Sequence, residues 1–333
     1  MGITFTDTDK GAVIMKRNNQ LIKKFQNHLW LVVMICLSSV SIHSASYMMI
    51  TDLGSSAEMI RRANIEGFSQ GSNAIFENPA GLHQVNVISA SVFSSQIMNE
   101  VNYRNVSIAI NSDIGVFGVG YMDSGVDDII KTKMVGEGQN ATVVADGMFS
   151  YKNRVFKLGF QSSITEELNI GINAVGYMNE IYTYSGGGYN IDVGAMYAFS
   201  ELKVSLFARN IIPTKILYSD SEDSQYQGEE SLPLQVVFGV AYPFGDLGVM
   251  GQLKFDGVNS LMSGAFEYTP SFLFDILNIS AGYKEFSVLD NISNTITMGV
   301  GLNLWGLSLD YAYEKSDHFE YDANNFASIG FDF

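Results

Sequence analysis

The sequence predicts an all-β chain that forms a transmembrane antiparallel β-barrel of about 14 strands, with an N-terminal plug or hatch segment. Three observations lead to this prediction. Runs of about ten residues alternate apolar and polar side chains, and they are joined in turn by short connections and by longer polar loops. Charged residues make up only 16% of the 333 residues, while aromatic residues reach 12% and glycines number 32. A cytosolic enzyme would carry about a quarter charged residues, so this composition favours strands that face lipid.

The N-terminal region has the order of a secretory signal peptide. A basic stretch precedes an apolar stretch, 30–37, and a run of small polar residues ends at Ser46. This order predicts that residues 1–46 are a signal peptide that is cleaved after Ser46. The apolar stretch is short for a membrane-spanning helix, so an N-terminal anchor is the weaker alternative. Met15 stands just before the basic stretch and offers a second start, which would make residues 1–14 an artefact of start-site choice.

The predicted mature chain is strongly acidic and has no cysteine. Cys36, the only cysteine, lies in the apolar stretch, so we expect no disulfide and no cysteine metal site. Removal of residues 1–46 leaves 14 basic and 33 acidic residues, a net charge near −19. So acidic a surface argues against nucleic acid as a partner.

Fourteen alternating runs make up the predicted barrel, 85–333. They lie near 85–96, 102–111, 114–123, 155–164, 167–180, 188–199, 201–212, 232–243, 247–256, 260–269, 276–286, 294–304, 307–314 and 325–333. Six connections are short or moderate, and the others, such as 124–154 and 213–231, are longer and polar. Bacterial barrels have short periplasmic turns and long external loops, with both termini in the periplasm, and this parity agrees with that rule.

The alternation is clean in the second half of the chain. In the run 294–304, Ile296, Met298 and Val300 share one face, and polar or small residues share the other. A soluble sandwich would show the same pattern with the apolar face in its core. The signal peptide, the loop parity and the terminal Phe333 favour the barrel. The runs 85–97 and 114–122 carry apolar residues on both faces, as expected where a strand is also covered on its inner side.

Residues 47–84 are predicted to supply this cover as a plug at the periplasmic mouth of the barrel. Ser55-Ser56-Ala57-Glu58 has the pattern of a helix start. The segment ends in Asn78-Pro79-Ala80-Gly81-Leu82. Asn78, Pro79 and Gly81 are expected to shape a turn, because Pro fixes φ and Gly tolerates positive φ. A gating role for the plug is the alternative.

The run ending in Asn78-Pro79-Ala80-Gly81-Leu82 resembles the N-terminal segment of the FadL-like outer-membrane proteins, in particular the PorV/PorQ family. In that family an Asn-Pro-Ala-Gly-Leu sequence closes the plug just before the first strand. Further similar segments follow in order through nearly all of the mature chain, at 189–197, 206–210, 232–242, 264–268, 281–283 and 309–313.

The resemblance implies a fourteen-stranded barrel with a plugged lumen in the bacterial outer membrane. FadL takes up long-chain fatty acids through a hydrophobic pocket and a lateral opening, and PorV accompanies cargo in type IX secretion. Two functions therefore stay open for this non-enzymatic protein: passage or binding of hydrophobic small molecules, or a secretion component that binds partner proteins. The expected partners are outer-membrane lipid, the barrel-assembly machinery, and either a hydrophobic ligand or secretion-system proteins. The resemblance assigns Phe333 as the signal read by the assembly machinery, with packing against lipid as its simpler role.

A lumen charge pair is predicted between Asp192 and Arg209. If the turn is centred between Ser200 and Glu201, facing residues have numbers that sum to 401, as these two do. Opposite charges directly across two strands stabilise a sheet. We expect this pair to be structural, with contact to a ligand as the alternative.

The sequence predicts no enzyme, no cofactor and no metal site. The predicted mature chain has two histidines, His83 and His318, and neither lies in a run that supplies a serine and an acid around it. The acidic loops lack the spacing of a known calcium motif.

Overall fold

The computed structural model describes residues 50, 53–97, 100–136, 141–222, 227–288, 291–315 and 323–333. All of them belong to one compact unit that begins at His43. The predicted signal peptide, 1–46, lies outside the described residues, and so does His318.

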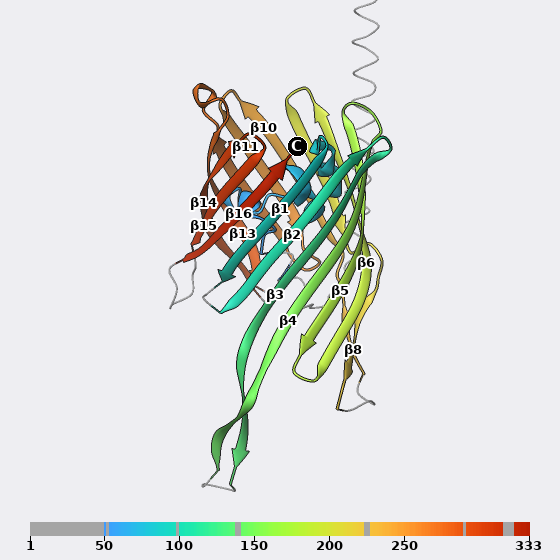
Figure 1. Cartoon of the computed structure of the whole chain (residues 1–333), viewed down its shortest axis with the longest axis vertical. Helices are drawn as coiled ribbons and strands as arrows, with labels where there is room; N and C mark the ends of the chain where they lie inside the picture. The colour runs from blue at the N-terminus through green and yellow to red at the C-terminus, as the bar shows by residue number, and fades with distance from the viewer. Residues whose placement is uncertain are drawn as a thin grey trace, which may run out of the picture. The chain divides into compact units, whose positions relative to one another are not determined.

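Sixteen strands form one antiparallel sheet, and fourteen of them close into a ring (Figure 1). The ring strands are β1 (Ile88–Ile97), β2 (Val101–Ser112), β3 (Gly115–Val135), β4 (Thr142–Ser163), β5 (Leu168–Ile181), β6 (Tyr184–Phe199), β7 (Leu202–Arg209), β10 (Gln235–Phe244), β11 (Leu247–Phe255), β12 (Ser260–Tyr268), β13 (Leu277–Val288), β14 (Asn291–Leu304), β15 (Leu307–Lys315) and β16 (Ala323–Asp332). β5 pairs with β6, and this pairing joins the two ends of the ring. The prediction of a closed barrel of fourteen strands is confirmed.

Six connections lie at the end of the barrel where β1 begins and β16 ends, and short connections such as the two residues between β5 and β6 also occur at the opposite end. The six connections join β2 to β3, β4 to β5, β6 to β7, β10 to β11, β12 to β13 and β14 to β15. The turn before β15 shows why they can be so tight: Trp305 and Gly306 both have positive φ, as a two-residue type I′ hairpin turn requires. The connection between β12 and β13 is longer and contains the short 3-10 turn η4 (Ser271–Leu273). We call this end of the barrel the short-turn end and the opposite end the long-loop end.

The outer wall of the barrel is apolar. On β14, Ile296, Met298 and Val300 are exposed on the outside, whereas Thr295 and Thr297 on the opposite face are buried. This is the face assignment that the alternation predicts. Apolar surface left in water costs roughly 25 cal/mol per Å², and lipid removes this cost. The outer wall is therefore suited to a lipid environment.

The apolar band ends toward the long-loop end at a row of charged residues. Arg104 on β2 faces Asp123 on β3, and Asp123 faces Arg154 on β4. Arg154 forms ion pairs with Asp123 at 3.5 Å and with Glu180 at 2.9 Å. Charges on the lipid face of a barrel are tolerated near the water interface and costly at mid-depth. The row therefore marks the border of the lipid-facing band.

Two of the predicted loops contain strands. β3 and β4 continue far beyond the other strands as a two-stranded arm (Figure 1), where a polar loop over 124–154 was expected. A shift in register between Val126 and Ile129 adds one residue to β3, which breaks the alternation in the sequence while the ladder continues. The predicted loop 213–231 contains β8 (Lys215–Asp220) and β9 (Gln227–Ser231), a hairpin attached to β6. The loop prediction was wrong at both places.

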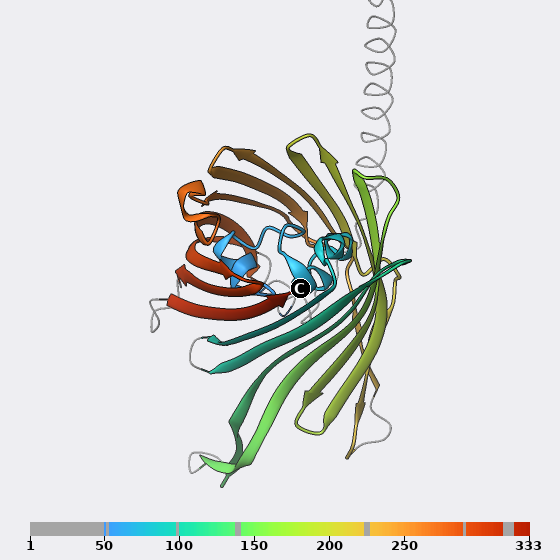
Figure 2. The ribbon, with the colours of Figure 1, turned by 45° about the horizontal axis from the view of Figure 1, so that its top comes forward.

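Residues 53–84, which we call the inner segment, lie within the ring of strands (Figure 2). This segment contains the helix α3 (Ala57–Arg61) and the 3-10 turns η1 (Gly71–Ile75) and η2 (Pro79–Gln84). The helix starts where the sequence indicates, because the Ser56 side chain accepts a hydrogen bond from the Met59 N–H. Among the described residues, no helix is long and apolar enough to cross a membrane.

The first and last strands pair with each other, as predicted. Ser89 on β1 faces Asp332 on β16, and the register continues to Ser95 and Phe326. Beyond β16, the Phe333 carbonyl accepts hydrogen bonds from the N–H groups of Val87 and Ile88, and the Phe333 N–H donates to the Ile88 carbonyl. The Phe333 side chain is exposed on the outside. The last residue therefore closes the seam through its backbone.

Deletion of Phe333 is expected to lower the amount of assembled barrel several-fold, because three backbone hydrogen bonds at the seam are lost, each worth about 1 kcal/mol. The readout is the fraction of protein in outer membranes that migrates as folded barrel before heating and as unfolded chain after it. Phe333→Ala keeps the backbone bonds and tests the aromatic ring alone. An assembled fraction for the deletion equal to that of the unaltered chain would contradict this role.

Candidate functional site

The predicted motif of residues 78–82 is seated against the inner wall at β6 and β7. The Asn78 side chain caps η2, where its Oδ1 accepts a hydrogen bond from the Ala80 N–H at 3.0 Å. Its Nδ2 donates to Ser205 Oγ at 2.9 Å and to the Ala195 carbonyl at 3.2 Å. Pro79 occupies the first position of the turn, where the missing N–H has no cost. Asn78 thus shapes the turn and binds it to the wall.

Gly81 differs from its expected role. It is not among the glycines with positive φ, so the turn does not depend on its conformational freedom. A methyl group at Gly81 would lie 3.0 Å from the Ala74 side chain, which means that the glycine serves the close packing of η1 on η2. Ala80 and Leu82, the other two residues of the motif, are fully buried.

Two glycines of the wall allow the motif to come so close. A methyl group at Gly194 on β6 would overlap Asn78 Oδ1 and lie 2.7 Å from Asn78 Cγ. A methyl group at Gly171 on β5 would overlap the Ala80 nitrogen and lie 2.7 Å from the Pro79 carbonyl oxygen. The wall and the motif are therefore shaped to each other.

Asp192 and Arg209 lie on facing strands in the predicted register, since Val193 faces Ala208. Both side chains are buried on the inner side. Their ion pairs run to other residues: Lys157 Nζ lies 2.8 Å from Asp192 Oδ2, and Arg209 Nη2 lies 2.6 Å from Glu66 Oε2. The inner segment thus supplies a partner of Arg209, Glu66, that the sequence did not indicate.

Glu66 connects the inner segment to two strands at once. Besides Arg209 on β7, its carboxylate lies 3.2 Å from Lys254 Nζ on β11. The side chains of Glu66 and Arg209 are each 1% exposed. Burial alone would raise the pKa of Glu66, but the charges of Arg209 and Lys254 outweigh it and hold this pKa below its ordinary value.

A second ionic cluster binds α3 to the opposite part of the wall. Arg62 forms a two-pronged contact with Glu267 on β12, with Nε and Nη2 at 2.8 and 2.7 Å from its two carboxylate oxygens. Arg61 Nε donates to Asp310 Oδ1 on β15 at 3.0 Å, and Arg61 also contacts Glu267. Arg62 Nη1 also donates a hydrogen bond to Glu58 Oε1 at 2.7 Å. The sequence analysis did not predict this cluster. Its one local sign is the pair of adjacent arginines, Arg61 and Arg62, in a chain with few charged residues.

Two buried glutamates of the inner segment have raised pKa values. Burial raises the pKa of Glu77 to about 7, against hydrogen bonds from Ser69 and from the Gly67 N–H. Burial likewise raises the pKa of Glu58 to about 7, although Arg62 opposes the shift. Both groups are therefore largely protonated in the folded protein at pH 5 to 6.

Stability of the folded protein is expected to fall as pH rises from about 5 to 8. A carboxyl whose folded pKa lies above its unfolded value of 4.5 binds more protons when folded, so its contribution is complete below pH 4.5 and lost as pH passes about 7. Glu66, with its lowered pKa, stays ionised throughout this window. The readout is the urea midpoint of unfolding at pH 5, 6, 7 and 8.

The matched variant for this prediction is Glu77→Gln, which keeps an acceptor for the Gly67 N–H and removes the titration. In this variant the fall of the urea midpoint between pH 5 and pH 8 should be about half as large as in the unaltered protein. An equally steep fall with pH in Glu77→Gln would show that this group is not responsible.

His83 lies at the end of η2, with its Nδ1 2.9 Å from the Ala80 carbonyl oxygen, and burial lowers its pKa. Within the described parts of the chain, no group of three or more His, Cys, Asp or Glu side chains is placed to hold a metal ion.

The inner wall changes from polar to apolar toward the long-loop end. On β1 the inward residues run from Ser89 and Ser91 to Phe93 and Ile97. Neighbouring strands continue the apolar surface, and we call these buried residues the apolar inner-wall cluster: Phe93, Ile97, Tyr103, Met122, Val155, Val175, Tyr177, Ile216, Leu232 and Phe326.

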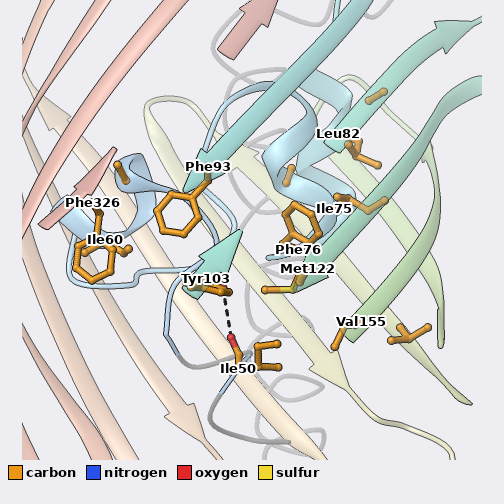
Figure 3. Close-up of a cluster of buried hydrophobic side chains, with 14 of the residues drawn as sticks. Ile50, Ile60, Ile75, Phe76, Leu82, Phe93, Tyr103, Met122, Val155 and Phe326 are labelled. Atoms are coloured by element: carbon orange, nitrogen blue, oxygen red, sulfur yellow. Dashed lines mark hydrogen bonds between the residues drawn. The ribbon is translucent and has the colours of Figure 1, made fainter. Parts of the chain in front are cut away.

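The apolar inner-wall cluster packs against the inner segment (Figure 3). Phe93 makes an edge contact with the Tyr103 ring, with centroids 5.2 Å apart, and stacks on Phe326 at 6.1 Å. Ile75 and Phe76 of the inner segment belong to the same packed group. The sequence carried part of this signal, because the runs 85–97 and 114–122 are apolar on both faces.

A narrow polar cavity lies between the inner segment and the wall. It separates Glu58 and Arg61 from β1, β15 and β16, and its volume of about 10 Å³ suits a single water molecule. The inner segment is thus held by apolar packing, by tight glycine contacts and by ionic contacts with the wall.

Solved structures with the same fold include two toluene transporters. The toluene transporter TodX of P. putida matches with a TM-score of 0.61 and 11% identity, over 84% of this chain and 99% of that chain. The toluene transporter TbuX of Ralstonia pickettii matches with a TM-score of 0.53 and 12% identity, over 82% of this chain and 98% of that chain. At such identities the likeness shows the fold. No protein-family model and no curated protein sequence matches this chain.

Proposed function

We propose that this protein is a non-enzymatic outer-membrane barrel that binds hydrophobic small molecules and lets them pass, with the inner segment as its hatch. The observation that carries the proposal is the apolar inner-wall cluster. Barrels that conduct water and ions have polar interiors. Here an otherwise polar inner wall becomes apolar toward the long-loop end.

The energetics of this surface favour an apolar ligand. An apolar molecule that buries about 200 Å² of its surface gains roughly 5 kcal/mol on leaving water. The cluster offers it aromatic and aliphatic contacts from several strands. Because Ile75 and Phe76 occupy the space against the cluster, a ligand must displace the inner segment to enter. The proposed location in the outer membrane rests on the apolar outer wall and on the fold shared with two toluene transporters.

Equilibrium binding of radiolabelled toluene and hexadecanoic acid to the purified barrel tests the proposal. Val155→Asn places a polar side chain in the apolar inner-wall cluster and should weaken binding of at least one probe fivefold or more. Val119→Asn, at an outward position on the adjacent strand, is the matched control and should leave binding unchanged. Equal binding by the two variants, or no binding of either probe by the unaltered protein, would refute the proposal.

The alternative is a secretion component resembling PorV, and the arm formed by β3 and β4 is the feature that favours it. Ile130, Met134 and Val143 are exposed on this arm, beyond the row of charged residues. Exposed apolar side chains outside the lipid-facing band suit contact with another protein. Purification from native membranes with mass spectrometry separates the two functions: a large protein partner without a bound small molecule would favour secretion.

A further inference from the structure

The outer wall has a groove across the seam between the first and last strands of the barrel. Its volume is about 440 Å³, and it is lined from four neighbouring strands, β2, β1, β16 and β15. Its polar lining includes Ser94, Gln96, Asn102, Arg104, Tyr311 and Asn325. These polar side chains point outward, away from the inner segment, while Ser95 and Phe326 contribute to the lining from the inward-facing positions of β1 and β16.

The register of the four strands explains the shape of the groove. Arg104 faces Ser94, Ser94 faces Ala327, and Ala327 faces Tyr311. Two small side chains therefore lie between two long ones, so Ser94 and Ala327 form the floor while Arg104 and Tyr311 form the sides. The Tyr311 hydroxyl is held by Asn325 Oδ1 at 2.5 Å.

The rows on either side place the groove at a border between lipid and water. One row nearer the short-turn end is wholly apolar and exposed: Val106, Val92, Ile329 and Leu309. One row nearer the long-loop end carries the side-chain amides of Asn102, Gln96 and Asn325. Arg104 also belongs to the row of charges that ends the lipid-facing band. A molecule in the groove would therefore have an apolar surface below it and hydrogen-bonding groups above it.

The groove presents an arginine in a protein whose formal net charge is −16. Among the described residues that line it, Arg104 carries a charge and none is acidic. Arg104 forms no ion pair with a described residue, and its facing neighbour Asp123 is engaged by Arg154 at 3.5 Å. Arg154 is the contrasting case, since it lies in the same row but is neutralised by Asp123 and Glu180.

We propose that this groove binds the phosphate headgroup of an anionic lipid in the outer leaflet. The Arg104 guanidinium is placed to bind the phosphate in a two-pronged contact, which is the geometry that arginine and phosphate share. The amide of Asn102 supplies a further donor. The acyl chain of the lipid lies along the exposed row that contains Val106 and Val92. The ligand is a lipid and not free phosphate, because the apolar row continues directly from the groove.

Native mass spectrometry of the detergent-solubilised barrel tests this site, with phosphatidylglycerol and diacylglycerol of the same acyl chains as probes. The unaltered protein should bind phosphatidylglycerol at least tenfold more tightly, since a hydrogen-bonded charge pair of this kind is worth about one decade or more in affinity. Arg104→Gln should abolish this preference. Arg154→Gln, the matched control in the same row, should keep it within twofold.

Two further arms make the test specific to a lipid in this groove. Ser94→Trp fills the floor without changing the charge and should also abolish the preference. Sodium phosphate at millimolar concentration should leave phosphatidylglycerol bound. The proposal fails if Arg104→Gln retains the preference, if Arg154→Gln loses it equally, or if inorganic phosphate displaces the lipid. Folding of each variant is checked by the shift in electrophoretic migration on heating.

Discussion

Glu66→Gln is expected to destabilise the folded protein by about 3 to 5 kcal/mol, the range for a buried ion pair that loses one partner. The variant keeps the shape of the side chain but leaves Arg209 and Lys254 as buried cations without their shared carboxylate. The folded state is destabilised because two cations are then kept out of water without the carboxylate that compensates them. Since Glu66 belongs to the inner segment and its partners belong to β7 and β11, we expect the inner segment to leave the wall before the barrel unfolds.

Two measurements separate these events: proteolysis within residues 53–84 reports release of the inner segment, and the urea midpoint reports unfolding of the barrel. Glu229→Gln is the control, because its ion pair with Lys215 is half exposed and worth at most about 1 kcal/mol. Asp192→Asn is the contrast within the wall: it leaves Lys157 unpaired but should not release the inner segment. Protection of the inner segment in Glu66→Gln equal to that in Glu229→Gln would contradict the assigned role of Glu66.

Gly171→Ala is expected to cost about 1 to 3 kcal/mol, the usual penalty for a forced contact in a packed interior. The added methyl group would meet the backbone of Pro79 and Ala80, which cannot rotate away as a side chain can. Gly176→Ala on the same strand is the control, because nothing lies within 4 Å of a methyl group there. That control should be neutral or slightly stabilising, since alanine restricts the unfolded chain more than glycine does.

Gly194→Ala offers a sharper test, because its methyl group would meet the Asn78 side chain instead of backbone. Asn78→Gly should therefore rescue Gly194→Ala, so that the double variant is more stable than the sum of the single effects predicts. The same Asn78→Gly change should not rescue Gly171→Ala. If the stability losses of Gly194→Ala and Asn78→Gly simply add in the double variant, the close approach of the motif to β6 is not the cause of the loss in Gly194→Ala.

The strand order could be predicted because the signals are local. Predicted strands 294–304 and 307–314 differ from β14 and β15 by three residues or fewer at each end. Alternation and tight turns depend on residues that are close in sequence. In a closed antiparallel barrel each strand pairs with the next one, so these local patterns are enough to give the strand order. The arm formed by β3 and β4 escaped the same reasoning because the bulge after Val126 shifts the alternation by one residue.

The ionic contacts could not be predicted in the same way. Hairpin register places Asp192 opposite the position of Arg209, but the partner that Arg209 binds, Glu66, is 143 residues away in sequence. No local pattern links a residue of the inner segment to a particular strand. The apolar inner-wall cluster was visible only as strands with two apolar faces, which indicates that something covers them without indicating what.

Closure of the barrel depends on the pairing of its most distant strands. From β1 to β5 and from β10 to β16, each strand pairs with the strand that follows it in the chain. β1 and β16, in contrast, can pair only after the whole chain has been made. Such non-local contacts form slowly, because loop closure must precede the gain from pairing. Until then the sheet has two open edges and an uncovered apolar wall, which is the state most prone to aggregate. We therefore expect that a longer-lived open intermediate lowers the fraction of chains that reach the folded form.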